Sequence, residues 1–459
     1  MSEQPRLAAL HRPLALTCSV VGAAVVALDG TVLTIAQPAL QADLGADTGQ
    51  VQWTSTGYLV AVASLLVFAG RLGDRYGHRR IFALGCLGFA GASAGIAAAT
   101  GIGWVVALRV LQGMAGALLQ PATLGMLRGA YPPERLGMPV ALRTSAIGLA
   151  AACGPLVGGL LVDAYGWRAV FLIGVAPTLL VALLCLAVPE PRRTAGRGGI
   201  RALDLPGAGL LGLALACLVH GLVQGPTAGA APPLVLAVVA GLAFAGHERR
   251  APQPLLPPDM LRPGPVAAGL GALLAVSAAL SGTLFTATYL LQDTLGLDPL
   301  STALRMVPLA LVMVVGAPLS ALTKKRVGAR ATATGGAVLL VLGVLLLARP
   351  EVTASALATG ACAGLIGAGF GAVMVTATSV VVHLAAAEHA GVAGGLQQTA
   401  MNTGPVVGVA LATLLLDSGT ALPALAAVAA LAVPATLGLP GNADREGGRR
   451  RLADTPAGP

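Results

Sequence analysis

Long apolar runs separated by short polar stretches fill the chain from Leu14 to Leu439. A helix needs about 20 mostly apolar residues to cross a hydrocarbon layer of about 30 Å. This pattern predicts fourteen membrane-spanning helices, near residues 14–38, 51–70, 80–99, 102–126, 138–163, 168–188, 205–224, 230–247, 266–292, 301–322, 331–349, 354–383, 390–416 and 419–439. We therefore expect an all-α integral membrane protein.

The predicted spans group into two sets of six with one pair between them. The expected parts are an N-terminal six-helix bundle at 1–190, a linker with two extra transmembrane helices at 191–265, a C-terminal six-helix bundle at 266–440 and a cytoplasmic tail at 441–459. The inserted pair is the least regular, because Pro232 and Pro233 shorten its second apolar core. Basic residues flank the pair on both sides, so it must cross the membrane twice or not at all.

Two sequence landmarks recur with the same offset. GPLVG at 154–158 returns as GPVVG at 404–408, and the charged loop GRLGDRYGHRR at 70–80 returns as SALTKKRVGAR at 320–330. Matching parts at matching positions indicate two related halves. This arrangement is typical of transporters built from repeated bundles around a central substrate site.

Composition agrees with a membrane protein. Only 10% of the 459 residues are charged, whereas 56% are hydrophobic, a balance that no soluble domain of this size requires. The 62 glycines suit helices that associate in lipid through close backbone contact. The net charge of +9 is carried by short loops, so we expect a lipid bilayer rather than nucleic acid as the partner.

The basic loops predict which side of the membrane is cytoplasmic. With the N-terminus inside, the rich basic clusters all fall inside, at 71–80, 128–135, 192–201, 249–262, 324–330 and 445–451. Trp53, Trp104 and Trp167 then lie at outer span ends, where indoles favour the interface. We expect a multi-pass protein of the cell membrane, with both termini cytoplasmic and the monomer as the functional unit.

No cofactor or metal is expected. The six cysteines lie singly inside apolar runs, without the paired spacing of a metal or redox centre. The spans also lack the cluster of His, Asp or Glu that a membrane-embedded enzyme needs. An enzymatic function is therefore not expected.

Asp29 is the only carboxylate well inside a predicted span. An ionised Asp near the middle of a membrane costs about 2.5 to 3.5 kcal/mol on insertion scales, and such residues usually face a water-filled cavity. We expect Asp29 to carry protons, to bind a cation, or both. The alternative is that Asp29 pairs with a polar neighbour and only holds helices together.

Arg109 and Gln112 lie three residues apart in the fourth predicted span, so they share one helix face. An arginine within a bundle needs a carboxylate, carbonyl groups or water, and we expect this pair to take part in proton coupling. Arg109 could instead reach the outer interface. Five further amides are candidate hydrogen-bond partners for a small-molecule substrate: Gln37, Gln120, Gln397, Gln398 and Asn402.

The fifth predicted span combines a helix breaker with small residues. Pro155 removes a backbone donor and kinks a helix, while Gly154 and Gly158 permit close contact with a neighbouring helix. Together with Gly159 they form a candidate helix pivot. Ordinary helix packing is the alternative explanation.

Four motifs resemble the major facilitator superfamily, and within it the fourteen-span drug/proton antiporters. They are LDGTVLTIAQP from Leu28, the loop GRLGDRYGHRR, RVLQGMAGA from Arg109 and CGPLVGG from Cys153. The resemblance implies two six-helix bundles with two extra helices between them, a role for Arg109 in proton transfer, and a cytoplasmic gate. The gate residues implied by the loop are Gly70, Gly73, Asp74, Arg75, Gly77 and Arg79.

The expected function is proton-coupled efflux of lipophilic drugs, antibiotics or a toxic metabolite by alternating access. A solute importer or metabolite permease of the same fold is the alternative. The GPLVGG stretch, which resembles the antiporter motif, favours export. Simple anchoring of the loop by positive charge would explain its arginines, but not Asp74 or the spaced glycines.

Overall fold

The structure is a computed structural model that describes residues 4–132, 135–188, 204–224, 228–252, 254–256, 264–297, 299–385, 389–416 and 418–441. The basic residues predicted to flank the inserted pair at 192–201, Arg262 and the predicted tail from residue 442 lie outside the described residues. Among the described residues every regular element is a helix. The predicted all-α fold is therefore confirmed.

The N-terminal half contains seven helices. They are α1 (Gln4–Leu44), α2 (Thr48–Tyr76), α3 (His78–Ala97), α4 (Ile102–Ala130), α5 (Gly137–Tyr165), α6 (Trp167–Leu172) and α7 (Val175–Cys185). The inserted pair is α8 (Leu205–Val223) and α9 (Ala231–Glu248), with the 3₁₀ turn η3 (Ala228–Ala230) before α9. These two helices pack on each other, and α8 packs on α2.

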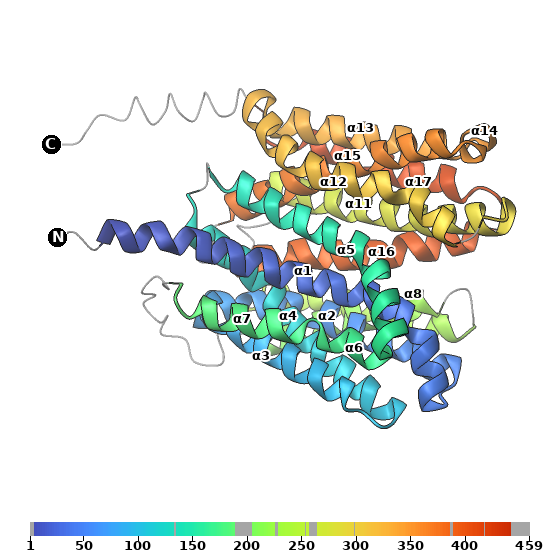
Figure 1. The fold of residues 1–459 in the computed structure, drawn as a ribbon. Helices are drawn as coiled ribbons and strands as arrows, with labels where there is room; N and C mark the ends of the chain where they lie inside the picture. Colours follow the sequence, from blue (N-terminus) through green and yellow to red (C-terminus); the bar gives the residue numbers. More distant parts are fainter. Residues whose placement is uncertain are drawn as a thin grey trace.

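The C-terminal half is also built from helices. Its elements are α11 (Gly264–Tyr289), the π-helix η4 (Leu290–Thr294), α12 (Pro299–Val327), α13 (Ala329–Leu347), α14 (Pro350–Ala354), α15 (Ala356–Leu384), α16 (Ala390–Leu415), α17 (Ala421–Ala430) and α18 (Ala432–Leu437). In Figure 1 most helices of the N-terminal half, in blue and green, lie below those of the C-terminal half, in yellow and red, and α5 and α16 lie where the halves meet.

Eleven helices in the described part of the chain are long and apolar enough to cross a membrane, or twelve if the two parts of α5 form one span. The chain is thus a multi-pass membrane protein. Helix α17 with α18 is shorter, so the count of fourteen spans stays a prediction.

Two predicted spans are each broken into two helices. The span at 168–188 is interrupted between α6 and α7, and the span at 419–439 is interrupted at Leu431. Pro177 and Pro434 lie three or four residues beyond these breaks. A proline ring clashes with the carbonyl four residues earlier and provides no hydrogen-bond donor for it.

Small residues allow very close helix contacts in both halves. A Cβ atom on Gly408 of α16 would lie 1.9 Å from the carbonyl oxygen of Ala278 on α11, and one on Gly113 of α4 would lie 2.6 Å from that of Tyr58 on α2. Both distances are too short for non-bonded atoms. Glycine at these positions therefore determines how closely the backbones approach, as is usual for helices in lipid.

The two halves contact each other through α2 with α16, α4 with α16, and α5 with α12. Ser145 of α5 donates a hydrogen bond of 2.6 Å to the carbonyl oxygen of Val314 on α12. A Cβ atom on Gly395 of α16 would lie 2.6 Å from the carbonyl oxygen of Leu66 on α2. Leu66 and Gly395 lie in the parts of α2 and α16 nearest to the loop at 70–80, so the halves are in close contact at that end.

Candidate functional site

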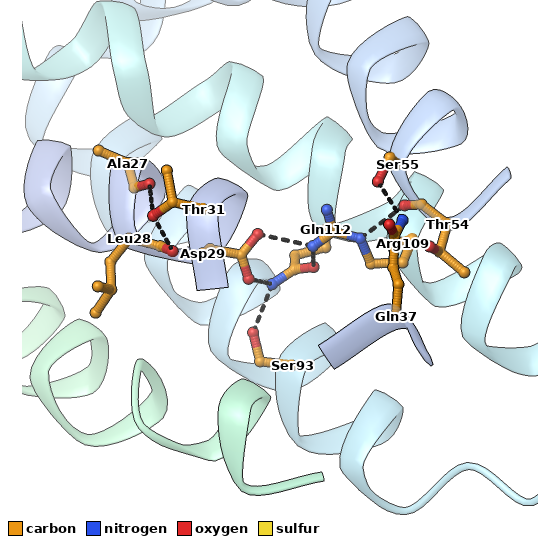
Figure 2. A network of polar contacts seen from close by, with 10 residues as sticks. All are labelled: Ala27, Leu28, Asp29, Thr31, Gln37, Thr54, Ser55, Ser93, Arg109 and Gln112. Atoms are coloured by element: carbon orange, nitrogen blue, oxygen red, sulfur yellow. Dashed lines mark hydrogen bonds and ion pairs between the residues drawn. The ribbon is translucent and has the colours of Figure 1, made fainter. Parts of the chain in front are cut away.

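The predicted proton-coupling residues meet in one buried cluster between α1, α2, α3 and α4. Asp29 comes from α1, and Arg109 and Gln112 come from adjacent turns of α4 (Figure 2). The side chain of Asp29 is 9% exposed, and that of Arg109 is 1% exposed. Arg109 therefore does not extend to the outer interface.

Arg109 joins three helices through its guanidinium group. Nη1 lies 2.7 Å from Oδ2 of Asp29, and Nε donates a hydrogen bond of 2.9 Å to the carbonyl oxygen of Thr54 on α2. Nη1 also donates to Oε1 of Gln112, at 2.6 Å. The guanidinium carbon lies 4.4 Å from the centre of the Tyr58 ring, close enough for a cation–π contact.

Gln112 occupies the other oxygen of the carboxylate. Its Nε2 donates to Oδ1 of Asp29 at 2.9 Å and to Oγ of Ser93 on α3 at 2.8 Å (Figure 2). Both carboxylate oxygens of Asp29 thus accept a hydrogen bond.

The predicted pivot glycines pack against the part of α1 that carries Asp29. A Cβ atom on Gly154 would lie 1.9 Å from Oγ1 of Thr31, and one on Gly158 would lie 3.1 Å from a methyl group of Val32. A Cβ atom on Gly159 would have no neighbour within 4 Å. The close contact of α5 with α1 therefore depends on the first two glycines.

Helix α5 is bent at the same place. Gly137–Ala151 and Leu156–Tyr165 form an angle of 46°, and the bend is visible where α5 turns in Figure 1. Pro155 lies in the helical backbone between these segments, and its side chain is outside the described part of the structure. The role of this stretch as a pivot stays a prediction.

Asp74 from the predicted gate binds the other half of the protein. Oδ1 accepts a hydrogen bond of 2.7 Å from the backbone N–H of Gly391, and Oδ2 accepts one of 2.9 Å from that of Val392. Both amides belong to the first turn of α16, where helix N–H groups have no partner within the helix. The negative charge of Asp74 also interacts favourably with the positive end of the helix dipole.

Two gate glycines have a clear geometric role. A Cβ atom on Gly70 would lie 2.0 Å from the carbonyl oxygen of Gly391, so no other residue fits between α2 and α16 without moving them apart. Gly77 has φ of +99°, a conformation that favours glycine. It forms the turn between α2 and α3.

The structure brings His78 into this gate, although the sequence pattern alone did not identify it. His78 is 8% exposed, and its Nε2 lies 3.2 Å from Oδ1 of Asp74. A Cβ atom on Gly73, Gly125 or Gly391 would lie within 2.7 Å of the His78 ring. The ring is therefore enclosed by three glycines from α2, α4 and α16.

The gate arginines have different contacts. Arg79 donates hydrogen bonds from Nη1 to the carbonyl oxygens of Leu186 and Val188, at 3.0 and 3.2 Å, within the N-terminal half. The guanidinium carbon of Arg75 lies 5.5 Å from the centre of the neighbouring Tyr76 ring. Among the predicted gate residues, Gly70 and Asp74 contact α16 directly.

A second carboxylate of α1 lies at the opposite end from the gate. Oδ2 of Asp43 accepts a hydrogen bond of 3.0 Å from the indole of Trp167 and one of 2.7 Å from Arg168. The Trp167 hydrogen bond, followed by that of Arg168, lowers the pKa of Asp43. This exposed carboxylate is separate from the Asp29 cluster.

Comparisons with known proteins agree with this architecture. A sequence model described as Major Facilitator Superfamily matches residues 20–409. The chain is 42% identical over 410 residues to the tetracenomycin C resistance and export protein of Streptomyces glaucescens, covering 87% of this chain and 74% of that protein. It is 36% identical over 415 residues to the puromycin resistance protein pur8 of Streptomyces alboniger, covering 86% and 80% of the two chains.

A solved structure supports the fold. The crystal structure of the human organic anion transporter MFSD10 (TETRAN) matches with a TM-score of 0.69 and 18% identity, covering 94% of this chain and 99% of that one. At this identity the match concerns the fold alone. With a family match over most of its length and two bundles that meet as described above, the chain is a transport protein, not an enzyme, and belongs to the Major Facilitator Superfamily.

Proposed function

We propose that this protein exports a lipophilic small molecule from the cell in exchange for protons, by alternating access. The single observation that carries the proposal is the buried cluster in which both oxygens of Asp29 are bound by Arg109 and Gln112. A buried charged cluster in a membrane bundle is costly, and such clusters mark ion and substrate pathways. Two relatives are named for antibiotic resistance, one of them also for export.

In this proposal, Asp29 exchanges a proton with solvent during each transport cycle. Protonation removes the charge that balances Arg109 and weakens the link between α1 and α4. Thr31, two residues after Asp29, packs against Gly154 of α5, and α5 contacts α12 in the other half through Ser145. Helices α1 and α5 thus offer a route of direct contacts from the proton site to the interface between the halves.

The gate supports the same cycle. Asp74 and the first turn of α16 hold the halves together at the end of the loop at 70–80. We place this end on the cytoplasmic side, with both termini cytoplasmic, fourteen spans arranged as six, two and six, and the monomer as the functional unit. The closed contact then corresponds to a state that faces outward. The importer alternative uses the same parts, and the names of the two relatives, for antibiotic resistance and in one case export, favour export.

The test is to replace Asp29 with Asn in proteoliposomes and to measure substrate movement driven by an imposed proton gradient. Candidate substrates come from a screen of lipophilic antibiotics and dyes on the unmodified protein. Asp29→Asn keeps the size of the side chain and one acceptor oxygen, so we expect a folded protein without gradient-driven transport. The matched control is Asp43→Asn, which removes a carboxylate from the exposed end of the same helix and is expected to transport normally.

Two outcomes would overturn the proposal. Full gradient-driven transport by Asp29→Asn would show that Asp29 is not the proton carrier. Equal flux with and without the gradient in the unmodified protein would remove proton coupling altogether.

A further inference from the structure

A second arginine, Arg143 of α5, is as deeply buried as Arg109 but lacks a comparable set of partners. It is 1% exposed. Its Nε donates a hydrogen bond of 3.2 Å to Oγ1 of Thr123 on α4. Within the described part of the chain this is its only hydrogen bond, and no carboxylate lies within ion-pair distance of it.

The contrast with Arg109 is informative. Arg109 is bound by a carboxylate, an amide oxygen and a backbone carbonyl, so its buried charge is compensated. An uncompensated buried charge is strongly destabilising in a folded protein, and charged residues inside membrane bundles usually face the interior and mark substrate pathways. Arg143 therefore needs a partner that the closed protein does not provide.

Arg143 lies at the edge of the contact between the two halves. Val140, one turn before it, packs in a cluster with Val382 of α15. Ser145, two residues after it, is hydrogen-bonded to Val314 of α12. Arg143 itself is hydrogen-bonded to Thr123 on α4. When the halves separate at this end, as alternating access requires, the guanidinium group becomes accessible from that side.

An unused amide on α16 points to the same region. Gln397 is fully buried, and neither its Nε2 nor its Oε1 has a hydrogen-bond partner. Gly394, one turn earlier, packs against α4, where a Cβ atom would lie 3.2 Å from the carbonyl oxygen of Pro121. The preceding residue on α4, Gln120, is 3% exposed and lies one turn from Thr123. A cation and two amides thus lie on α4, α5 and α16 around the closed contact.

We propose that Arg143 binds an acidic group of the transported substrate when this end of the protein opens, and that the substrates are lipophilic organic anions. The inference rests on the proposed function, which supplies the open state. A guanidinium group binds a carboxylate or another oxyanion through two parallel hydrogen bonds, and the amides of Gln120 and Gln397 can bind further oxygen atoms. Asp29 does not repel an anion strongly, because Arg109 compensates its charge.

A purely structural role for Arg143 explains the contacts less well. Other arginines that hold helices together bind carbonyl groups, as Arg305 does with Thr353 and Arg330 with Leu439. A lipid headgroup is also a poor partner, because Arg143 is enclosed by α4 and the interface between the halves and does not face the surrounding lipid.

The test compares the binding of two matched fluorescent probes, pyrenebutanoate and the neutral pyrenebutanamide, to the purified full chain in nanodiscs, with empty nanodiscs as background. We expect the unmodified protein to bind the anion at least about tenfold more tightly than the amide, as is usual for a hydrogen bond to a charged group. Arg143→Gln should bring the two affinities close together by weakening the binding of the anion alone. The control Arg135→Gln removes an exposed charge just before α5 and should retain the preference.

Two results would overturn the inference: no preference for the anion in the unmodified protein, or an unchanged preference in Arg143→Gln. If Arg143→Gln fails to fold, the preference for the anionic probe is measured in Arg143→Lys instead. A lysine keeps the charge but cannot donate two parallel hydrogen bonds to one oxyanion. The preference for the anionic probe should therefore fall by at least about threefold, and an unchanged preference contradicts the proposal. Binding of the probes is measured without a proton gradient. A failure of the proton-coupling test with Asp29→Asn therefore does not decide the binding result, and a failure of the binding test does not decide whether transport is coupled to protons.

Discussion

At the scale of single residues, the Asp29 cluster depends on the shape of the Arg109 side chain. One planar guanidinium group binds a carboxylate on α1, a carbonyl on α2 and an amide on its own helix. Each hydrogen bond to a charged group contributes about 1.5 to 3 kcal/mol, and loss of one partner leaves the others unsatisfied. The cluster therefore stabilises the packing of three helices around the proposed proton site.

Replacing Arg109 with Lys is expected to reduce gradient-driven transport at least tenfold. A lysine retains the charge but cannot bind Asp29, Gln112 and Thr54 at the same time, because it lacks the planar guanidinium group with donors in several fixed directions. Transport in proteoliposomes and thermal unfolding of the purified protein measure the effect.

Ser93→Ala is the control, because it removes only the hydrogen bond that Gln112 donates to Ser93. It should cost about 1 kcal/mol of stability and leave most of the transport. If Arg109→Lys transports as well as Ser93→Ala, the shape of the guanidinium group is not essential.

At the scale of helices, the approach of α2 to α16 is set by glycine on both sides. Gly70 and Gly391 face each other, and a Cβ atom on either would lie about as close to the backbone of the other, at 2.0 and 2.1 Å. Backbone atoms cannot move aside as the end of a flexible side chain can. The contact must therefore open if either residue gains a side chain.

Gly70→Ala is expected to shift the protein towards states that are open at this end. Spin labels on the ends of α2 and α16 nearest the gate should report a longer mean distance than in the unmodified protein. Gly91→Ala on α3 is the control, because a Cβ atom there would have no neighbour within 4 Å. An unchanged distance distribution in Gly70→Ala would contradict a role of this contact in closing the gate.

At the scale of the whole molecule, Asp74 links the two halves across the gate by accepting hydrogen bonds from the N-terminus of α16. Asp74 and the amides of Gly391 and Val392 are far apart in sequence but within hydrogen-bond distance. An anion at a helix N-terminus typically contributes 0.3 to 1 kcal/mol, and up to about 2 kcal/mol where it is partly buried. Such an energy can shift an equilibrium between open and closed states by about tenfold without fixing either one.

Asp74→Asn should therefore slow turnover more than it weakens substrate binding. The asparagine keeps one acceptor oxygen but loses the charge, so the closed state becomes less populated. Transport rate and equilibrium binding of the same substrate measure the two effects separately. Asp163→Asn, at an exposed position of α5, is the control for loss of a carboxylate. A defect in substrate binding alone in Asp74→Asn would contradict a role of Asp74 in the gate.

The sequence by itself determined the features that depend on local pattern. Membrane spanning follows from the length and polarity of each run, so the all-α membrane fold could be predicted without knowing which helices touch. Asp29 could be singled out in the same way, because a carboxylate inside an apolar run is costly wherever the helix packs. The spacing of Arg109 and Gln112 on one helix face was also readable, and these two side chains are hydrogen-bonded.

Only the tertiary structure decided which groups meet across the chain. The hydrogen bond from Arg109 to Asp29 joins residues 80 positions apart, and that from Gly391 to Asp74 joins residues 317 positions apart. Two of the partners, Thr54 and Gly391, contribute backbone atoms, which carry no sequence signal. Among the described residues, no carboxylate lies within ion-pair distance of the buried Arg143. The local sequence around Arg143 does not show which distant groups surround it.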